Sequence, residues 1–335
     1  MPAPAVIVHK YHALGNDFLV AFGPGCGPTG QSALPPTLHT GVARRLCHRR
    51  RGIGADGLVL VDRAPVGPAG GWSFRLWNAD GSEAEMSGNG LRCAAHALAE
   101  AGLVPGWGSP APVALVFSTP AGPRSVQLRP AGGPGRAWGT VDMGPVGMAP
   151  VNMAPVGTAP VDMGTVDMGT VDMGTVDMGT VGMAPVDLEG GGRRGGGPAC
   201  NVDVGRLQVV VGNPHLVVLG PDPATVDVAT LGPALEAGAA GGRNVEFVAL
   251  GPGPDEVTMR VWERGVGETE ACGTGSCAAA AALYRWGRVG PTVTVHQPGG
   301  AMEVTLGADG TARLGGPSEQ VATCVVVPQV VEVPG

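Results

Sequence analysis

Residues 77–90 read WNADGSEAEMSGNG, and residues 262–275 read WERGVGETEACGTG. At a constant offset of 185 residues the two segments share one Trp, two Glu and two Gly, and Ser87 meets Cys272. Each segment follows a strand-like run, WSFRLW or EVTMRVW, and precedes a helix-like run, LRCAAHALAEAG or SCAAAAALYRWG. A second echo pairs LGNDF (14–18) with VGNPH (211–215) at a slightly different offset. The pattern predicts a duplicated α/β unit with two related strand-to-helix turns.

Each of these turns places a small polar side chain, Ser87 or Cys272, directly before Gly-x-Gly and the start of a helix. Glycine lets the backbone turn sharply and approach a ligand closely. The free N–H groups of a helix N-terminus bind anions, so a ligand carboxylate fits there. The same field lowers the pKa of a cysteine from about 8.5 toward neutrality. We therefore expect Cys272 to become a thiolate and to act as a base.

Two opposed groups of this kind suit the transfer of a proton from one face of a carbon to the other. One group removes the proton, the other delivers one, and the helix N-termini stabilise the charge that builds on a neighbouring carboxylate. This chemistry requires neither a metal nor an organic cofactor, and we expect none. A cysteine before an Ala-rich helix is more often a buried packing residue, which is our interpretation of Cys93 and Cys277. The paired context distinguishes Cys272 from them.

Composition excludes several other classes of protein. The chain has 335 residues, enough for two modest domains, and a formal net charge of −7, which disfavours a nucleic-acid partner. Its single lysine, Lys10, is expected to be a solvated charge, so it does not suggest a Schiff base with pyridoxal phosphate. The seven cysteines form no CxxC pair, which disfavours a disulfide framework or a zinc site and favours the cytoplasm. Neither a signal peptide nor a membrane span is expected.

Residues 141–185 consist of a five-residue repeat of the VDMGT type in nine copies, and a Gly-rich run at 190–197 follows. The period matches neither a helix nor a strand. Two interpretations stay open, an expanded flexible linker or a small solenoid in which Val and Met stack. We expect a first domain at 1–142 that includes a C-terminal strand at 318–335, a linker at 143–198, and a second domain at 199–317.

Five blocks of the sequence resemble the diaminopimelate epimerase family, and they occur in the family's order. The blocks are HALGNDF (12–18), NADGSEAEMSGNGLR (78–92), GNPH (212–215), RNVEFV (243–248) and ERGVGETEACGTGSCAAA (263–280). The resemblance covers both halves and leaves out mainly 143–198. It implies an α+β fold of two pseudo-symmetric domains, each a curled mixed sheet around a central helix, with the site in the cleft between them.

The resemblance also implies a function. It implies an isomerase that interconverts LL- and meso-2,6-diaminopimelate without a cofactor, by two-base proton transfer, in lysine and peptidoglycan precursor biosynthesis. The small-molecule amino-acid substrate is then the principal partner, and the protein is expected to be a homodimer.

The matching motifs imply a role for each site residue, with Cys272 as one catalytic base and Ser87 at the position of the other. The side chains expected to hold the polar groups of the substrate are Asn16, Asn78, Asn213 and Asn244. Glu263 and Arg264 would bind its distal amino-acid end, where a charged pair reads an ammonium and a carboxylate together. Backbone N–H groups for the reacting carboxylate would come from Gly88, Asn89, Gly273 and Thr274. His215 would support the site from behind. Without the resemblance, such asparagines are ordinary turn or cap residues, and Glu263–Arg264 is a surface pair.

Ser87 is the main departure, because the family usually has cysteine there. A hydroxyl is a far weaker acid than a thiol, so Ser87 should be a poor base, although it can still relay a proton through water. Three explanations stay open: a slow or directionally impaired epimerase, another substrate with Cys272 as the only base, or an engineered or degenerate copy. A lesser departure lies in GIGADG (52–57), where some relatives have a larger polar residue at the position of Gly57.

Two rival functions follow from these explanations. One is a lyase or isomerase of the hydroxyproline-dehydratase type that acts on a related amino acid with one base. Glu263 and Arg264 disfavour it, because they suit a substrate with a second amino-acid end. The other is a non-catalytic binding homologue that keeps the pocket without turnover.

Overall fold

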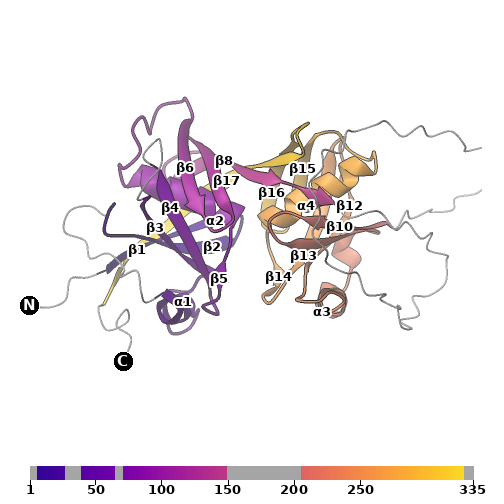
Figure 1. The fold of residues 1–335 in the computed structure, drawn as a ribbon, viewed down its shortest axis with the longest axis horizontal. Coiled ribbons are helices and arrows are strands. Elements are labelled where there is room, and N and C mark those ends of the chain that lie inside the picture. The colour runs from indigo at the N-terminus through magenta and orange to yellow at the C-terminus, as the bar shows by residue number, and fades with distance from the viewer. Residues whose placement is uncertain (1–5, 27–38, 65–70, 149–204, 328–335) are drawn as a thin grey trace, which may run out of the picture. The chain divides into compact units, whose positions relative to one another are not determined.

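The chain repeats one series of strands and helices in its two halves, as the computed structural model shows (Figure 1). The structure describes residues 6–26, 39–64, 71–148 and 205–327. The first half contains β1 (Val6–Ala13), β2 (Asn16–Phe22), α1 (His39–Cys47), β3 (Gly57–Arg63), β4 (Trp72–Asn78), β5 (Glu83–Ala84), α2 (Gly88–Glu100), β6 (Val113–Thr119), β7 (Gly122–Pro130), β8 (Arg136–Pro145) and β9 (Gly147–Met148). The second half contains β10 (Gly205–Val210), β11 (Pro214–Leu219), the 3₁₀ turn η1 (Pro223–Thr225), α3 (Val228–Glu236), β12 (Asn244–Leu250), β13 (Glu256–Glu263), β14 (Gly267–Thr269), α4 (Gly273–Arg285), β15 (Thr292–Gln297), β16 (Gly300–Leu306) and β17 (Thr311–Val326).

The two halves share their strand pairings step by step. Each begins with an antiparallel pair, β1–β2 or β10–β11, whose second strand lies parallel to β3 or β12. An antiparallel strand, β4 or β13, follows and pairs with the short β5 or β14 before the long helix begins. After the helix, β6 lies parallel to β4 just as β15 lies parallel to β13. The predicted duplication and the pseudo-symmetric α+β fold class are confirmed.

The strands of each half surround its long helix. α2 contacts β1, β2, β7, β8 and β17, and α4 contacts β10, β11, β12, β13 and β16. Every residue of α2 before Glu100 is buried, and α4 is buried from Gly273 to Leu283. Because both helices are rich in alanine, the sheets can pack closely around them on all sides. Cys93 and Cys277 are fully buried within these helices, as predicted for packing residues.

The last strand, β17, takes part in both halves. Its residues 312–315 pair with β16, its residues 311–319 pair with β8, and its residues 319–326 pair with β1. A single strand of 16 residues therefore links the strands of the two halves, and Figure 1 shows it beside β8. The predicted domain bounds stay a prediction, and residues 328–335 of the expected C-terminal strand lie outside the described residues.

The first copies of the repeat form regular structure. Val141–Pro145 is the end of β8, and Gly147–Met148 is β9, which pairs with β10 through Met148 and Val209. The other copies, the Gly-rich run and both interpretations of the repeat lie outside the described residues.

Lys10 corrects one prediction, because it is an ion-pair partner and not a solvated charge. Its Nζ lies 2.9 Å from Asp17 Oδ2 and donates to the carbonyl of Gly54 at 2.7 Å. The Lys10 side chain is 19% exposed. Asp17 is buried between the first strands, and a buried carboxylate needs a cation nearby, which explains the difference.

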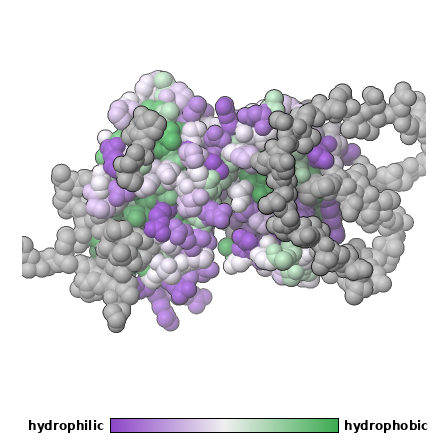
Figure 2. All heavy atoms as spheres, viewed as in Figure 1, coloured by the Kyte–Doolittle hydropathy of each residue, from purple (hydrophilic) through white to green (hydrophobic). Residues whose placement is uncertain are grey.

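Other expectations from composition can be compared with the described part of the chain. The cysteines that it contains are all free thiols. None of its helices is long and apolar enough to span a bilayer. On the face drawn in Figure 2, hydrophilic and apolar side chains are interspersed.

Leu314, on β17, lies where the two long helices begin. It is fully buried, and a Cβ atom added to Gly88 or to Gly273 would come within 2.8 or 2.7 Å of its Cδ2 atom. Because both halves of the described chain belong to one compact unit, this side chain fills the space between the two helix starts.

We expect Leu314→Ala to lower the free energy of unfolding by about 2–5 kcal/mol, since it leaves a cavity between two rigid helices. Urea unfolding followed by circular dichroism measures the change. Val321→Ala, on the same strand but 54% exposed, is the control and should cost less than about 0.5 kcal/mol. An equal effect of the two substitutions would contradict the role of Leu314.

Candidate active site

The starts of α2 and α4 open on one cavity of about 830 Å³, which is lined by residues from both halves. All twelve residues that the sequence predicts to be catalytic or substrate-binding line it. These are Asn16, Asn78, Ser87, Gly88, Asn89, Asn213, Asn244, Glu263, Arg264, Cys272, Gly273 and Thr274. The structure therefore brings together residues that are up to 258 positions apart in the sequence.

Ser87 and Cys272 occupy equivalent positions, since each is the N-cap residue of its helix. Their backbones are extended, with φ/ψ of −143°/122° and −129°/117°. Ser87 Oγ accepts a hydrogen bond from the N–H of Gly90 at 3.1 Å, and Cys272 Sγ accepts one from Gly275 at 3.4 Å. An N-cap side chain normally satisfies a free N–H of the first turn in this way.

A matched ion pair holds the strands in front of each turn. Arg75 Nε lies 2.8 Å from Glu83 Oε1, and Arg260 Nε lies 2.7 Å from Glu268 Oε1. Both pairs join the long strand to the short strand that leads into the helix. The residues that the two sequence segments share therefore include the glutamates of these ion pairs, Glu83 and Glu268, as well as the glycines of the turns.

The two helix N-termini are neighbours. A Cβ atom on Gly273 would lie 3.5 Å from Asn89 Oδ1 and 3.8 Å from the backbone N of Asn89. Free N–H groups from both helices can therefore reach one anion in the cavity. This is the arrangement that a negatively charged carboxylate requires.

The environment of Cys272 differs from the predicted one. The residue is 4% exposed, its backbone N–H donates to Gln297 Oε1 at 2.8 Å, and its Sγ lies 3.5 Å from Thr274 Oγ1. Burial raises the pKa of Cys272 well above its usual value, and the carboxylates of Glu263 and Glu246 raise it further. The hydrogen bonds from Thr274 and Gly275 oppose this rise. The expected lowering of the pKa is wrong, because burial and two nearby acids outweigh the helix N-terminus.

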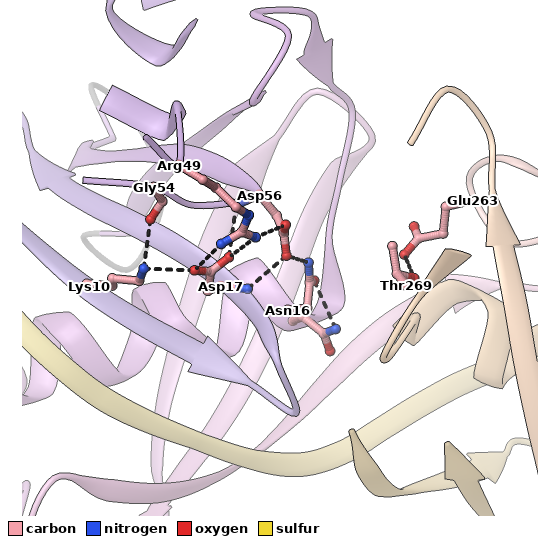
Figure 3. A network of polar contacts seen from close by, with 9 residues as sticks. Lys10, Asn16, Asp17, Arg49, Gly54, Asp56, Glu263 and Thr269 are labelled. Carbon is pink, nitrogen blue, oxygen red and sulfur yellow. Dashed lines mark hydrogen bonds and ion pairs between the residues drawn. The ribbon is translucent and has the colours of Figure 1, made fainter. Parts of the chain in front are cut away.

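Glu263 and Arg264 follow one another at the end of β13. Glu263 Oε1 accepts a hydrogen bond from Thr269 Oγ1 at 2.6 Å (Figure 3). Burial raises the pKa of Glu263, whereas hydrogen bonds from Thr269 and Cys272 lower it. The backbone N–H of Arg264 donates to Asn244 Oδ1 at 2.9 Å, and its Nη1 donates to Gly241 at 3.1 Å.

Asn16 is held by a cluster of charged residues on the first half (Figure 3). Its Nδ2 donates to Asp56 Oδ2 at 2.8 Å. Arg49 Nη2 lies 2.6 Å from Asp56 Oδ1 and 2.9 Å from Asp17 Oδ1, and Lys10 completes the cluster. Burial raises the pKa of Asp56, and hydrogen bonds from Asn16 and the charge of Arg49 oppose the rise.

His215 lies behind the residues that line the cavity. Its Nδ1 is 2.7 Å from Glu246 Oε1, and its Nε2 is 2.8 Å from Asn213 Oδ1. His215 and Glu246 are both buried. The pair therefore holds the side chain of Asn213 in its position in the cavity lining.

Sequence reasoning missed Asp56, Thr269 and Glu246. A signal was present for Glu246, because an acidic residue in the apolar run VEFV of a buried strand needs a polar partner. Asp56 lies in the quoted GIGADG stretch without any mark of its contact with Asn16. In the described part of the chain, His, Cys, Asp and Glu form no cluster of three or more that could hold a metal ion.

Comparison with known proteins gives a family and a fold. A family model described as diaminopimelate epimerase matches residues 8–149 and 207–320. A protein of Desulforudis audaxviator (strain MP104C) named diaminopimelate epimerase is 37% identical over 323 residues, covering 93% of this chain and 96% of the relative. One of the same name from Moorella thermoacetica (strain ATCC 39073 / JCM 9320) is 36% identical over 319 residues, covering 93% and 96%.

A solved structure shares the fold. The hydroxyproline epimerase of Agrobacterium vitis, crystallised with trans-4-hydroxy-L-proline, matches with a TM-score of 0.64 at 16% identity and covers 98% of this chain and 95% of its own.

We expect alkylation of Cys272 by iodoacetamide to keep rising with pH beyond the ordinary cysteine range of about 8.5, because its pKa is raised. Glu263→Gln removes one of the charges responsible and should move the profile to lower pH. Mass spectrometry of the Cys272 peptide measures both. Cys324, partly exposed on β17, is the internal reference and should be labelled equally in the two proteins. An unchanged Cys272 profile would show that Glu263 does not act on the thiol.

Proposed function

The chain belongs to the diaminopimelate epimerase family, a family of isomerases, and from this premise we propose that it interconverts LL- and meso-2,6-diaminopimelate, slowly, because Ser87 replaces one thiol. The observation that carries the proposal is the placement of Ser87 and Cys272 as equivalent N-caps around one cavity. The reaction supplies meso-diaminopimelate for lysine and peptidoglycan precursor biosynthesis.

In the proposed reaction Cys272 removes the proton from the α-carbon. The thiolate is the form that acts as the base, and the hydrogen bonds from Thr274 and Gly275 favour it. As the C–H bond breaks, negative charge spreads onto the reacting carboxylate. Backbone N–H groups at the two helix starts stabilise that charge, and they need no reorientation to do so. The residues concerned are Gly88, Asn89, Gly273 and Thr274.

The opposite face of the carbon must then receive a proton. Ser87 is the group on that side, and its hydroxyl is a much weaker acid than a thiol. Delivery of the proton, by Ser87 or by water that it holds, is therefore the slow step. The return of the same proton from Cys272 to the first face competes with it and restores the starting isomer.

The distal end of the substrate carries a second ammonium and a second carboxylate. Arg264 supplies a cation and Glu263 an anion to the lining of the cavity, which suits such a zwitterion. Asn78, Asn213 and Asn244 add hydrogen bonds to it. This pairing favours a substrate with two amino-acid ends over the single end of a hydroxyproline-type substrate.

The homodimer implied by the resemblance and the cytoplasmic location favoured by the cysteines are part of the proposal. Val321, Val325 and Val327 are 54%, 68% and 57% exposed at the C-terminal end of the described chain, an apolar surface that a second copy could cover.

We expect solvent deuterium to enter the α-position of one isomer faster than that isomer is inverted, since Cys272 can exchange its proton while Ser87 delivers slowly. Incubation in heavy water with proton NMR and chiral chromatography measures exchange and inversion separately. Equal rates of the two would contradict a slow Ser87 side. Neither exchange nor inversion, combined with tight binding, would indicate a binding protein without turnover.

We expect Ser87→Cys to raise the inversion rate by about a hundredfold to ten thousandfold, the usual contribution of a positioned acid–base group. Ser87→Ala is the matched control: loss of the residual inversion would assign the proton relay to the hydroxyl. Ser125→Cys, an exposed serine on β7, adds a thiol away from the site and should change nothing. An unchanged inversion rate in Ser87→Cys would contradict diaminopimelate as the substrate.

A further inference from the structure

The orientation of the Asn89 carboxamide is set by a buried arginine. Arg92 is completely buried, and its Nη2 donates to Asn89 Oδ1. A guanidinium has only donors, so the atom of Asn89 that faces it must be the oxygen. Asn89 Nδ2 then points the other way, where it donates to Asn16 Oδ1 at 3.1 Å.

The orientation of Asn16 is set independently, from the other end. Asp56 Oδ2 accepts from Asn16 Nδ2 at 2.8 Å and from the backbone N–H of Asp17 at 3.0 Å. Paired with Arg49, the Asp56 carboxylate is ionised and can only accept, so the atom of Asn16 that faces it must be the nitrogen. The orientations required at Arg92 and at Asp56 are therefore consistent. In the series of hydrogen bonds from Arg92 through Asn89 and Asn16 to Asp56, every donor points toward Asp56.

This series of hydrogen bonds determines which donors and acceptors of Asn16 and Asn89 remain for a ligand. Each carboxamide oxygen accepts one hydrogen bond and is turned toward its donor in this series, and each amide nitrogen donates one of its two hydrogens. Among the described residues, one N–H of Asn16 and one of Asn89 are left without an acceptor, and both residues line the cavity. Asn244 has the same polarity, since its Oδ1 accepts from the Arg264 backbone and its Nδ2 donates to the carbonyl of Pro214 at 3.4 Å.

Arg92 is built into the structure at a cost. A Cβ atom on Gly316 would collide with its guanidinium, and one on Gly139 would come within 2.9 Å of its Cγ. Its Nε and Nη1 have no hydrogen-bond partner in the described part of the chain, and burial lowers the pKa of Arg92 to about 10. A buried cation that lacks an acidic partner destabilises a fold, so a role beyond packing is indicated.

We propose that Arg92 and Asp56 are positioning residues that turn Asn16 and Asn89 so that amide N–H groups face the cavity, which makes the site select a carboxylate over a neutral amide. The proposal deepens the proposed function, since diaminopimelate carries two carboxylates. It assigns no proton transfer to either residue. Its test uses ligands that cannot react, so it does not depend on turnover.

The test compares pimelate with its uncharged analogue pimelamide, each bound to the full chain in isothermal titration calorimetry. We expect the wild-type protein to prefer pimelate, and Asp56→Asn to lower the ratio of the two affinities by about tenfold, because Asn16 can then present its oxygen. Arg92→Met should lower the ratio to a similar extent. Arg92→Lys, which keeps a donor, should restore part of it.

Two exposed substitutions are matched controls. Asp309→Asn, on the turn before β17, and Arg129→Met, on β7, should leave the ratio unchanged. If Arg92→Met fails to fold, as judged by circular dichroism, Asp56→Asn decides the matter, since it keeps the shape of the side chain. Equal affinity of the wild-type protein for both ligands, binding of neither, or an undiminished ratio in folded Asp56→Asn would overturn the proposal.

Deuterium exchange on diaminopimelate in the same preparations separates the two proposals. Pimelate selectivity without exchange or inversion would remove the epimerase function and leave the role of Arg92 and Asp56 intact. Exchange without any selectivity for pimelate would overturn the role of Arg92 and Asp56 and leave the epimerase function intact.

Discussion

The contact of two helix N-termini across Leu314 is the constraint on which the rest of the structure depends. Gly88 and Gly273 both pack against the same methyl group, so neither position can carry a side chain while the helices stay this close. The close approach lets free N–H groups from both helices converge on one anion. It also places the N-cap side chains Ser87 and Cys272 on a common cavity. The symmetry of the fold thus becomes a two-sided site.

Burial sets the chemistry of that site more strongly than the helix termini do. Burial and the nearby carboxylates raise the pKa of Cys272, although its N-cap position favours a thiolate. Removing water has the opposite effect on the charged substrate, because each hydrogen bond from a fixed donor becomes stronger. The same burial therefore makes the free thiol less reactive and makes the bound carboxylate easier to stabilise. Ser87 has a hydroxyl in the equivalent position, which is a weaker acid than a thiol.

Most of the fold and the site could be predicted from the sequence, because duplication leaves a pattern that one chain reveals by itself. The pair Ser87–Cys272 and the Gly-x-Gly turns specified the helix starts, and the family blocks specified which asparagines gather there. The role of Lys10 could not be predicted, since its partner Asp17 is buried by strand pairings that its sequence neighbours do not encode. The pKa direction of Cys272 also depends on residues from other strands, Glu246 and Glu263, whose distance to the thiol is a property of the folded state.

The pairing of β9 with β10 has a consequence for how this chain varies. Met148 lies opposite Val209, so two residues that are 61 positions apart in the sequence are neighbours in space. Additional residues between two such positions cost little free energy, since the entropy of loop closure changes only with the logarithm of the number of residues. Adding or removing copies of the pentapeptide should therefore leave the pairing of Met148 with Val209 unchanged.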